Sequence, residues 1–534
     1  MTAPATLPQH PQQSSFALSK WLERATVACL VLLAAAAPIS IAATQTAWLL
    51  SMLFWVARFF FRPRPPLYRT AVDYALLGFF ILSLISALCS YEPDLSIGKL
   101  PAASLFTIVY VVAQNVSSHR VLRTLVIVLV ASCAVSAVYT FGVFAWGRGV
   151  KVRELPAGSP LAAVGVRAGD TILSVDGVAM NTPEEVEHAI ATERPATEKV
   201  YRWPDGKVAC VWDERSACVR VYRSEFVPTF NFPRQAFASG ATSAQRLGIG
   251  SWSRGRDERA SGFYGQYQTY SEVLQLIASL ALGLLVAHGN RLSWGALLCA
   301  AVFASLCGAL LLTVTRASWA GLLLSSLTIT ILGARRRRMV LVFAAIALPL
   351  VIAGALVLQQ KRGVGFLDRR DQSTTWRETV WREGVLLLMS KPRHLLVGVG
   401  MDTLKRRWPE WGMFDGGRLP WGHLHSTPLQ IAFERGLLAL AAWLVLLFAY
   451  ARACWRLARQ AHHDWIARGL ALGALGGMIG FFASGLVHYN VGDSEVAMVF
   501  YLIMGLALAA ERLHSDGHVG TSIPNRMMPV GERQ

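Results

Sequence analysis

The chain is poor in charge. Only 16% of its 534 residues are Asp, Glu, Lys or Arg, whereas 54% are hydrophobic, and a soluble domain usually carries about 25% charged residues. This composition argues against an ordinary soluble protein. The apolar residues gather in runs that suit membrane-spanning helices, which need roughly 20 residues. Because no small-residue cleavage site follows the first run, we interpret it as a span and not as a secretory signal.

Several catalytic signatures are also absent from the sequence. No His-Glu-x-x-His occurs, and Phe482-Ala483-Ser484-Gly485 lacks the first glycine of a rhomboid-type serine motif, which argues against an intramembrane protease. No glycine-rich loop ending in Lys-Ser/Thr is present, so ATP hydrolysis is not expected. The outer segments hold no cluster of metal-ligating residues with the spacing of a site, so we predict that neither a metal nor a cofactor is required.

Cysteine is scarce away from the apolar runs, because six of the eight lie in these runs or directly beside one. Cys210 and Cys218 lie in two strand-like segments, 208–212 and 217–222, and a hairpin loop at 213–215 would place them opposite each other. The outer side of a bacterial inner membrane is oxidising, which permits a disulfide. Cross-strand geometry often aligns the sulfurs poorly, so a disulfide and two free thiols both remain open.

The apolar runs predict an all-α polytopic membrane protein with about twelve transmembrane helices and both chain ends in the cytoplasm. The expected spans are at about 25–40, 42–61, 71–89, 101–115, 121–145, 267–287, 293–312, 317–334, 339–358, 428–450, 467–487 and 495–511. Short cytoplasmic loops are rich in Lys and Arg. With the N-terminus inside, every inner loop carries arginine, for example the run 335–338, while the short outer turns carry almost none.

The region 146–264 interrupts this membrane pattern. Gly169 and Asp170 indicate a turn, residues 171–175 indicate a strand, and Asp176-Gly177 indicates the turn that ends it. Thr182-Pro183 indicates the start of a helix that Thr182 caps. Over 152–226 these features resemble the PDZ domains of bacterial periplasmic proteases, a small α+β fold that binds an extended peptide as an added strand. A domain that binds no peptide and only orients the membrane part is the alternative.

Separated motifs follow in the second half of the chain, at 315–318 (TRAS), 376–384 (WRETVWREG), 398–400 (GVG), 421–431 (WGHLHSTPLQI) and 434–437 (ERGL). Over about residues 260–450 they resemble the O-antigen ligase and polymerase superfamily. The resemblance implies a GT-C-like glycosyltransferase of the bacterial inner membrane with its active site facing the periplasm. Ser426 stands where that family usually has Asn, and residues 262–267 lack another Asn that is common there. These two departures put the identity of the substrate in question more than the type of reaction.

These assignments divide the chain into seven parts. They are spans 1–5 (1–145), a PDZ-like periplasmic domain (146–230), a periplasmic linker (231–266), spans 6–9 (267–358), a periplasmic catalytic loop (359–427), spans 10–12 (428–511) and a cytoplasmic tail (512–534). The catalytic loop has twelve Lys/Arg against seven Asp/Glu. This surplus could serve an anionic ligand or rest on lipid head groups.

His425 is the candidate base. Thr427 can cap a helix that begins at Pro428, so His425 would lie just outside that helix at the outer membrane surface. The positive field of a helix N-terminus favours a phosphate and disfavours imidazolium, so we expect a neutral imidazole. The alternative is an ordinary interfacial histidine.

Arg316, Arg377 and Arg382 are the candidate ligands of a donor diphosphate, because a guanidinium binds phosphate through paired hydrogen bonds. Arg316 lies at the outer end of a span, where arginine is unexpected. Arg377 and Arg382 belong to a Trp-containing amphipathic stretch that could equally lie on the membrane.

Glu434 is expected in a supporting role, about half a helical turn out of phase with His425 and paired with Arg435 or another buried arginine. His423, Glu272 and His488 are expected to be structural or interfacial.

The predicted function is an O-antigen ligase-type transfer of a polysaccharide from undecaprenyl diphosphate to lipid A-core, with inversion and without a metal. An O-antigen or exopolysaccharide polymerase and a protein O-oligosaccharyltransferase remain alternatives within the superfamily. A transporter or flippase of the lipid-linked glycan is the alternative of another class. Transporters place charges on broken helices near the bilayer midplane, whereas the candidate groups here gather at the outer ends of spans.

Overall fold

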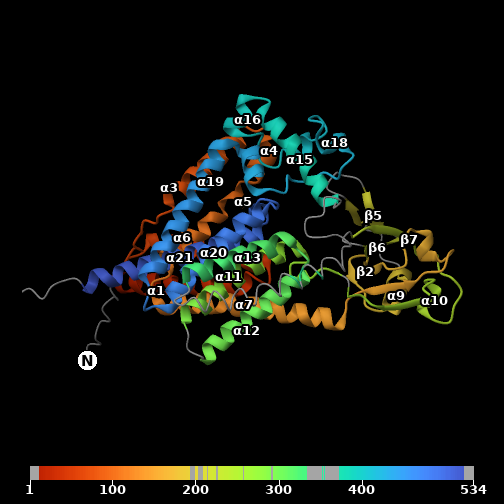
Figure 1. Cartoon of the computed structure of the whole chain (residues 1–534), viewed down its shortest axis with the longest axis horizontal. Helices are drawn as coiled ribbons and strands as arrows, with labels where there is room; N and C mark the ends of the chain where they lie inside the picture. Colours follow the sequence, from red (N-terminus) through yellow and green to blue (C-terminus); the bar gives the residue numbers. More distant parts are fainter. Residues whose placement is uncertain are drawn as a thin grey trace, which may run out of the picture.

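The computed structural model describes residues 11–521, apart from 193–198, 203–207, 213, 224–226, 257, 290–292 and, within 334–371, all but 352, 354 and 356. Most of the chain forms a helical bundle, with a small domain beside it (Figure 1). The principal bundle helices are α1 (Pro11–Ala36), α2 (Ile41–Ala57), α3 (Asp73–Leu88), α6 (Thr107–Asn115), α7 (His119–Trp146), α11 (Tyr267–His288), α12 (Trp294–Leu312), α13 (Arg316–Gly333), α19 (Thr427–Gln460), α20 (Trp465–Gly485) and α21 (Ser494–Thr521).

Among the described residues, seven helices are long and apolar enough to cross a membrane, namely α7, α11, α12, α13, α19, α20 and α21. The chain is therefore a multi-pass membrane protein, as its composition indicates. The count of twelve spans stays a prediction, and the expected span at 339–358 lies almost wholly outside the described residues. The expected span at 101–115 is a shorter helical stretch of α5 (Leu100–Ala103), η2 (Ser104–Phe106) and α6.

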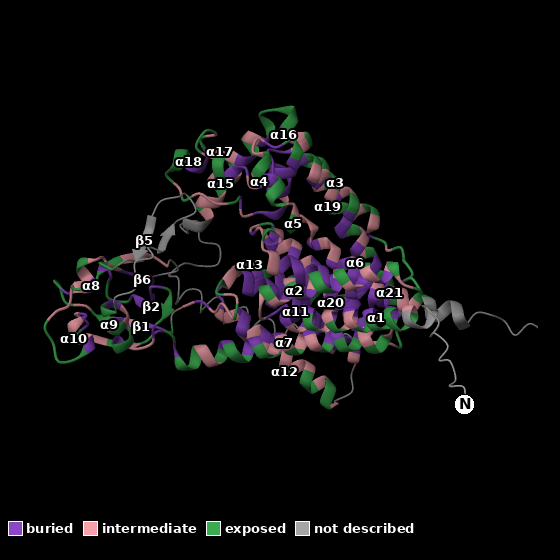
Figure 2. Ribbon diagram, turned by 180° about the vertical axis from the view of Figure 1, so that it is seen from behind, coloured by how far each residue is buried: buried purple, intermediate pink, exposed green. Residues whose placement is uncertain are grey.

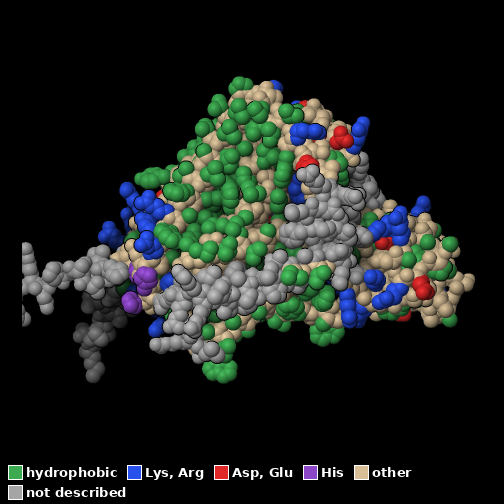
Figure 3. Space-filling view, in the orientation of Figure 1, with side chains coloured by type: hydrophobic (Ala, Val, Ile, Leu, Met, Phe, Trp, Pro, Cys, Tyr) green, Lys and Arg blue, Asp and Glu red, His purple; other side chains and the backbone are tan. Residues whose placement is uncertain are grey.

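Burial divides the bundle into a centre and a rim. Buried residues gather in α11, α20 and α21 (Figure 2), whereas large apolar side chains such as Phe448 (69% exposed) and Leu53 (60% exposed) remain on the outside. Hydrophobic side chains accordingly cover the face over α3 and α19 (Figure 3). An exposed apolar surface of this extent suits contact with lipid.

The inserted domain is built on an antiparallel sheet with the strand order β7-β6-β2-β1-β8. Its strands are β1 (Val150–Glu154), β2 (Thr171–Val175), β3 (Val178–Ala179), β6 (Ser216–Tyr222), β7 (Thr229–Pro233) and β8 (Ser251–Arg254), with a separate pair of β4 (Lys199–Arg202) and β5 (Val208–Trp212); its helices are α8 (Pro160–Ala163), α9 (Pro183–Ala191) and α10 (Ser243–Arg246). Two local predictions are confirmed. Thr182 caps α9 by accepting a hydrogen bond from the Glu185 N–H, and Asp176 and Gly177 turn β2 into β3 with positive φ.

Two longer-range expectations for this domain are wrong. The expected linker 231–266 is not only a linker, because it contains α10 and β8, and β8 completes the sheet beside β1. The expected hairpin between 208–212 and 217–222 is not found in the described strands: β6 pairs with β2 and β7, which leaves it no free edge for β5. Cys218 is disulfide-bonded, but the side chain of its expected partner Cys210 lies outside the described residues.

The segment before α19 is folded. It contains α15 (Gln372–Met389), α16 (Pro392–Val397), α17 (Leu404–Arg407) and α18 (Met413–Gly417), and its apolar core includes Val380, Phe414 and Leu424. Arg406 and Arg407 form ion pairs with Glu92 at 2.9 and 2.6 Å. Part of the basic surplus of the expected catalytic loop is therefore already neutralised by carboxylates.

A break in α19 joins this folded segment to the bundle. Gly436 adopts φ 82° and ψ 171° inside the helix, so the helix is interrupted after Arg435. The N–H groups of Val399 and Gly400 donate to the carbonyls of Phe433 and Glu434, each at 2.9 Å. The GVG and ERGL motifs thus meet, and the loop supplies hydrogen bonds that the broken helix loses.

The break generates a prediction about stability. Gly436→Ala should lower the free energy of unfolding by about 1–3 kcal/mol, because essentially only glycine adopts this φ/ψ region. A Cβ there would also lie 2.2 Å from the Leu396 carbonyl oxygen. Gly78→Ala in α3 is the control, since a Cβ at Gly78 meets nothing within 4 Å. Equal unfolding midpoints for both variants in detergent would contradict the account.

Candidate functional site

Two imidazoles flank an anchored leucine just before α19. The Leu424 N–H donates to Oε1 of Gln430 at 2.7 Å, and Nε1 of Trp381 donates to the Leu424 carbonyl at 2.6 Å. The Leu424 side chain is fully buried. The rings of His423 and His425 lie 4.1 Å apart, and the His425 N–H donates to Nδ1 of His423 at 3.2 Å. Anchoring the intervening residue therefore fixes where both imidazoles lie.

The start of α19 differs from the expected one. Ser426, and not Thr427, occupies the N-cap position, and its side chain makes no capping hydrogen bond. Thr427 instead binds the His488 carbonyl, through its N–H at 2.8 Å and its hydroxyl at 3.0 Å. Pro428 has no N–H. The helix N-terminus therefore offers an anion less than the sequence suggests, and binding of a diphosphate must depend on cationic side chains.

The electrostatic environment keeps the imidazoles neutral. The pKa of His425 is lowered to about 2, by burial first and then by the charges of His423, Arg377 and His488. The pKa of His423 is lowered to about 4, again by burial first and then by nearby cations. His423 as a residue is more exposed than His425, which is half-buried, although the His423 imidazole lies in surroundings that disfavour the charged form.

Arg377 is the predicted arginine that the structure brings to these imidazoles. It is half-buried on α15, and its charge contributes to the lowered pKa of His423, His425 and His488. The neighbouring Trp376 ring meets the His425 ring edge-on, with 5.0 Å between their centroids.

Arg382, unlike Arg377, does not lie towards the imidazoles of His423 and His425. Its side chain is exposed, and five residues along a helix turn it by about 140° relative to Arg377.

Arg316 opens α13 on the neighbouring part of the bundle and is half-buried. Next to it, Nε of Arg259 donates to the Thr313 carbonyl at 2.8 Å, and the same guanidinium binds the Val314 carbonyl. The charge of Arg259 also lowers the pKa of His488. Arg259 thus binds the segment before α13 and also lies close enough to His488 for its charge to act on that imidazole.

His488 and Glu272, expected to be structural or interfacial, contact each other near the site. Nδ1 of His488 lies 2.8 Å from Oε1 of Glu272, and both side chains are almost fully buried. Burial, Arg377 and Arg259 lower the pKa of His488 to about 3. The contact is therefore best described as a hydrogen bond of a neutral imidazole.

Glu434 has a different set of partners from the expected one. Its carboxylate accepts hydrogen bonds from Nε2 of Gln430 (2.9 Å), the Asp402 N–H (3.1 Å) and the Tyr489 hydroxyl (3.2 Å). Within the described chain no ion pair joins it to Arg435, whose guanidinium lies over the Phe79 ring. Because Gln430 also holds the Leu424 N–H, Glu434 supports the site by fixing the residue between the two histidines.

Sequence reasoning missed Arg259, Gln430 and Tyr489. The signal for Arg259 was available: like Arg316, it is an arginine next to the outer end of an expected span, where basic residues are uncommon. Gln430 and Tyr489 gave no such signal, because their roles depend on tertiary contacts. The described residues contain no group of three or more His, Cys, Asp or Glu that could hold a metal ion.

Comparison with known proteins addresses the part of the chain that builds this site. No curated protein matches the chain. The model of the O-antigen ligase family matches residues 299–444, a range that contains Arg316, Arg377, His425 and Glu434 but not the inserted domain. This part of the multi-pass membrane protein is therefore similar to the O-antigen ligase family.

Proposed function

We propose that this chain is a glycosyltransferase of the bacterial inner membrane that moves a polysaccharide from undecaprenyl diphosphate to lipid A-core without a metal ion. The observation that carries the proposal is the contact of α15 with His425, where the Trp376 ring lies 5.0 Å from the His425 ring and Arg377 is the next residue, inside the segment that matches the O-antigen ligase family. The active site would face the periplasm, as the distribution of arginine over the short loops predicts.

The chemistry needs one base and one anion-binding group. His425 accepts the proton of the acceptor hydroxyl as the new carbon–oxygen bond forms at the anomeric carbon. The bond from that carbon to the diphosphate breaks, and Arg377 and Arg316 stabilise the negative charge of the leaving diphosphate. Attack opposite the leaving group inverts the anomeric centre. A diphosphate is already a stable anion, so it needs no general acid.

Because the resting pKa of His425 is low, its strength as a base depends on whether the donor is bound. An imidazole with a pKa of about 2 is a weak base. A bound diphosphate would offset the charge of Arg377 and raise that pKa, because a nearby negative charge favours the imidazolium. His425 would thus become an effective base only once the donor is in place.

Transport of a lipid-linked glycan is the second candidate, favoured by the break of α19 at Gly436. The carbonyls near this break are hydrogen-bonded by Val399 and Gly400, so they are not available to a substrate, and we prefer the transferase. Polymerisation, or transfer to a protein, uses the same chemistry with another acceptor. Both stay alternatives within the proposal.

The first prediction concerns the base. His425→Ala should reduce turnover about a hundredfold or more, in line with the usual loss of a general base, and should leave donor affinity nearly unchanged. His188→Ala, on the exposed side of α9, is the control. Turnover and donor binding would be measured on purified, folded variants. Near-normal turnover of His425→Ala, with activity lost in His423→Ala instead, would transfer the role to His423.

The second prediction concerns pH. Because the resting pKa of His425 is lowered to about 2, its imidazole is unprotonated in the free enzyme from pH 8 down to about pH 5. kcat/KM, which reports the ionisations of the free enzyme, should therefore show no His425-dependent fall near pH 6.5. kcat reports the donor complex, in which the pKa of His425 is raised. On lowering the pH, kcat should therefore begin to fall at a higher pH than kcat/KM does. A fall of kcat/KM near pH 6.5 that disappears in His425→Ala would contradict this.

The third prediction separates the arginines of α15. Arg377→Lys should weaken donor binding about tenfold, because a point charge lacks the fork geometry of a guanidinium. Arg382→Lys is the matched control on the same helix and should change donor affinity less than twofold, since an exposed charge contributes little. Equal effects of the two substitutions on donor affinity would refute this assignment.

A further inference from the structure

Basic side chains gather where the inserted domain meets the bundle. Lys151, Arg153, Ser253, Arg254 and Arg256 line one pocket on the β1–β8 edge of the sheet. Lys and Arg side chains are also prominent over this domain, on the side that adjoins the bundle (Figure 3). In the described part of the chain no carboxylate forms an ion pair with Arg254 or Arg256. Arg153, Arg254 and Arg256 are exposed, and a cluster of exposed cations favours a polyanionic ligand.

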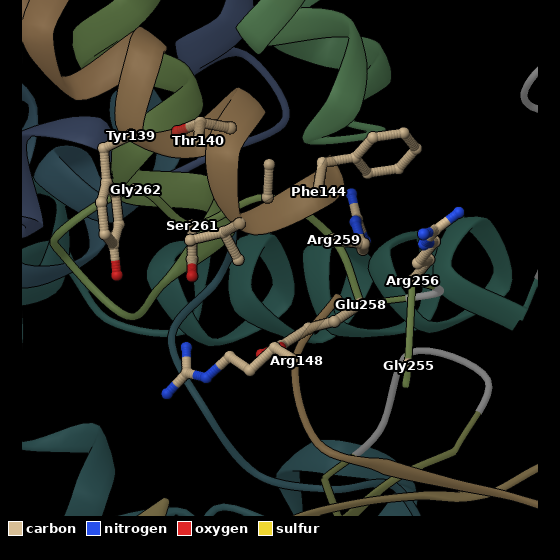
Figure 4. A pocket seen from close by; sticks show the side chains of 12 residues that line it. Tyr139, Thr140, Phe144, Arg148, Gly255, Arg256, Glu258, Arg259, Ser261 and Gly262 are labelled. Atoms are coloured by element: carbon tan, nitrogen blue, oxygen red, sulfur yellow. The ribbon is translucent and has the colours of Figure 1, made fainter. Parts of the chain in front are cut away.

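A second pocket continues this surface towards the candidate site. It is lined by Tyr139, Thr140, Val143, Phe144, Arg148, Gly255, Arg256, Glu258, Arg259, Ala260, Ser261 and Gly262. Figure 4 shows Arg148 and Glu258 extending across it, with Arg256 and Arg259 on one side and Tyr139 on the other. The two pockets share Arg256. Arg259, which lines this pocket, is buried and binds the Val314 carbonyl just before Arg316, so the pocket reaches the segment that precedes α13.

The same place has the marks of a membrane surface. The span α7 ends at Trp146, which is 72% exposed, and Phe144 is 40% exposed. With 28 residues α7 is about 42 Å long, more than the hydrocarbon core of about 30 Å. Its end therefore reaches the head-group level, where tryptophan is favoured, and Arg148 follows directly.

We propose that this surface, formed by Arg148, Lys151, Arg153, Arg254 and Arg256, binds the phosphates of the lipid acceptor and directs its sugar head group towards His425. The inference rests on the proposed transfer to a lipid acceptor. Several cations around one pocket suit a head group with more than one phosphate better than a phospholipid with a single charge. Continuity of the pockets with Arg259 favours a substrate over bulk lipid, because bulk lipid needs no path to the active site. The inserted domain is then an acceptor-recruiting module.

The test measures binding apart from catalysis. Full-length His425→Ala protein in nanodiscs of zwitterionic lipid is titrated with lipid A-core, and with the same lipid after phosphatase treatment. Adding Arg254→Glu and Arg256→Glu should raise the Kd for the phosphorylated acceptor about tenfold or more, since each cation near a lipid surface contributes about 1 kcal/mol. Donor affinity should be unchanged. Arg167→Glu is the control, an exposed arginine of the same domain that lines neither pocket, and glutamine at 254 and 256 is the milder variant should the double reversal not fold.

Each other outcome overturns the inference. An unchanged Kd in the charge-reversed and the glutamine variants, or equal binding of the dephosphorylated lipid, removes the role of the cations. Displacement of lipid A-core by a few per cent of phosphatidylglycerol, or by an acidic peptide, shows that the surface serves bulk lipid or a protein. The proposed function fails separately, if wild-type protein does not transfer the glycan or if His425→Ala retains turnover.

Discussion

The arrangement of the site depends on two backbone hydrogen bonds at the break of α19. Breaking a helix inside a membrane leaves carbonyls that no water can satisfy, and each costs several kcal/mol unless another group binds it. Val399 and Gly400 provide those hydrogen bonds to Phe433 and Glu434. A Cβ at Gly398 would lie 2.3 Å from the Glu434 carbonyl, so the loop can approach this closely only as glycine. The requirement explains why the GVG and ERGL motifs occur together.

This contact then determines the position of the candidate base. Docking the loop places the Asp402 N–H on the Glu434 carboxylate, Glu434 orients Gln430, and Gln430 holds the Leu424 N–H. Leu424 in turn fixes His423 and His425 beside Arg377. Because Glu434, Gln430 and Leu424 are buried and hydrogen-bonded, the imidazoles beside them are held before any substrate arrives, the preorganisation that electrostatic catalysis requires.

Features set by neighbouring residues could be predicted from the sequence, and those set by distant ones could not. The cap at Thr182 and the Asp176-Gly177 turn follow local rules, and hydropathy alone locates most of the bundle helices. Among the predicted site residues, the structure brings His425 and Arg377 near each other, and their roles remain predictions. Sequence reasoning failed for β8, whose pairing with β1 joins segments about a hundred residues apart, and for Glu434, whose partners come from three separate parts of the chain. Arg259 was missed although its position near the outer end of an expected span was a local signal.

The central claim is that this chain forms a glycosidic bond between a diphosphate-linked glycan and a lipid acceptor. The most direct measurement reconstitutes the purified protein in liposomes with the undecaprenyl diphosphate-linked polysaccharide, lipid A-core and excess EDTA. The account predicts that polysaccharide joined to lipid A-core accumulates with inverted configuration, together with free undecaprenyl diphosphate. Movement of the donor across the bilayer without a new glycosidic bond, or lengthening of the donor glycan in place of ligation, would contradict it.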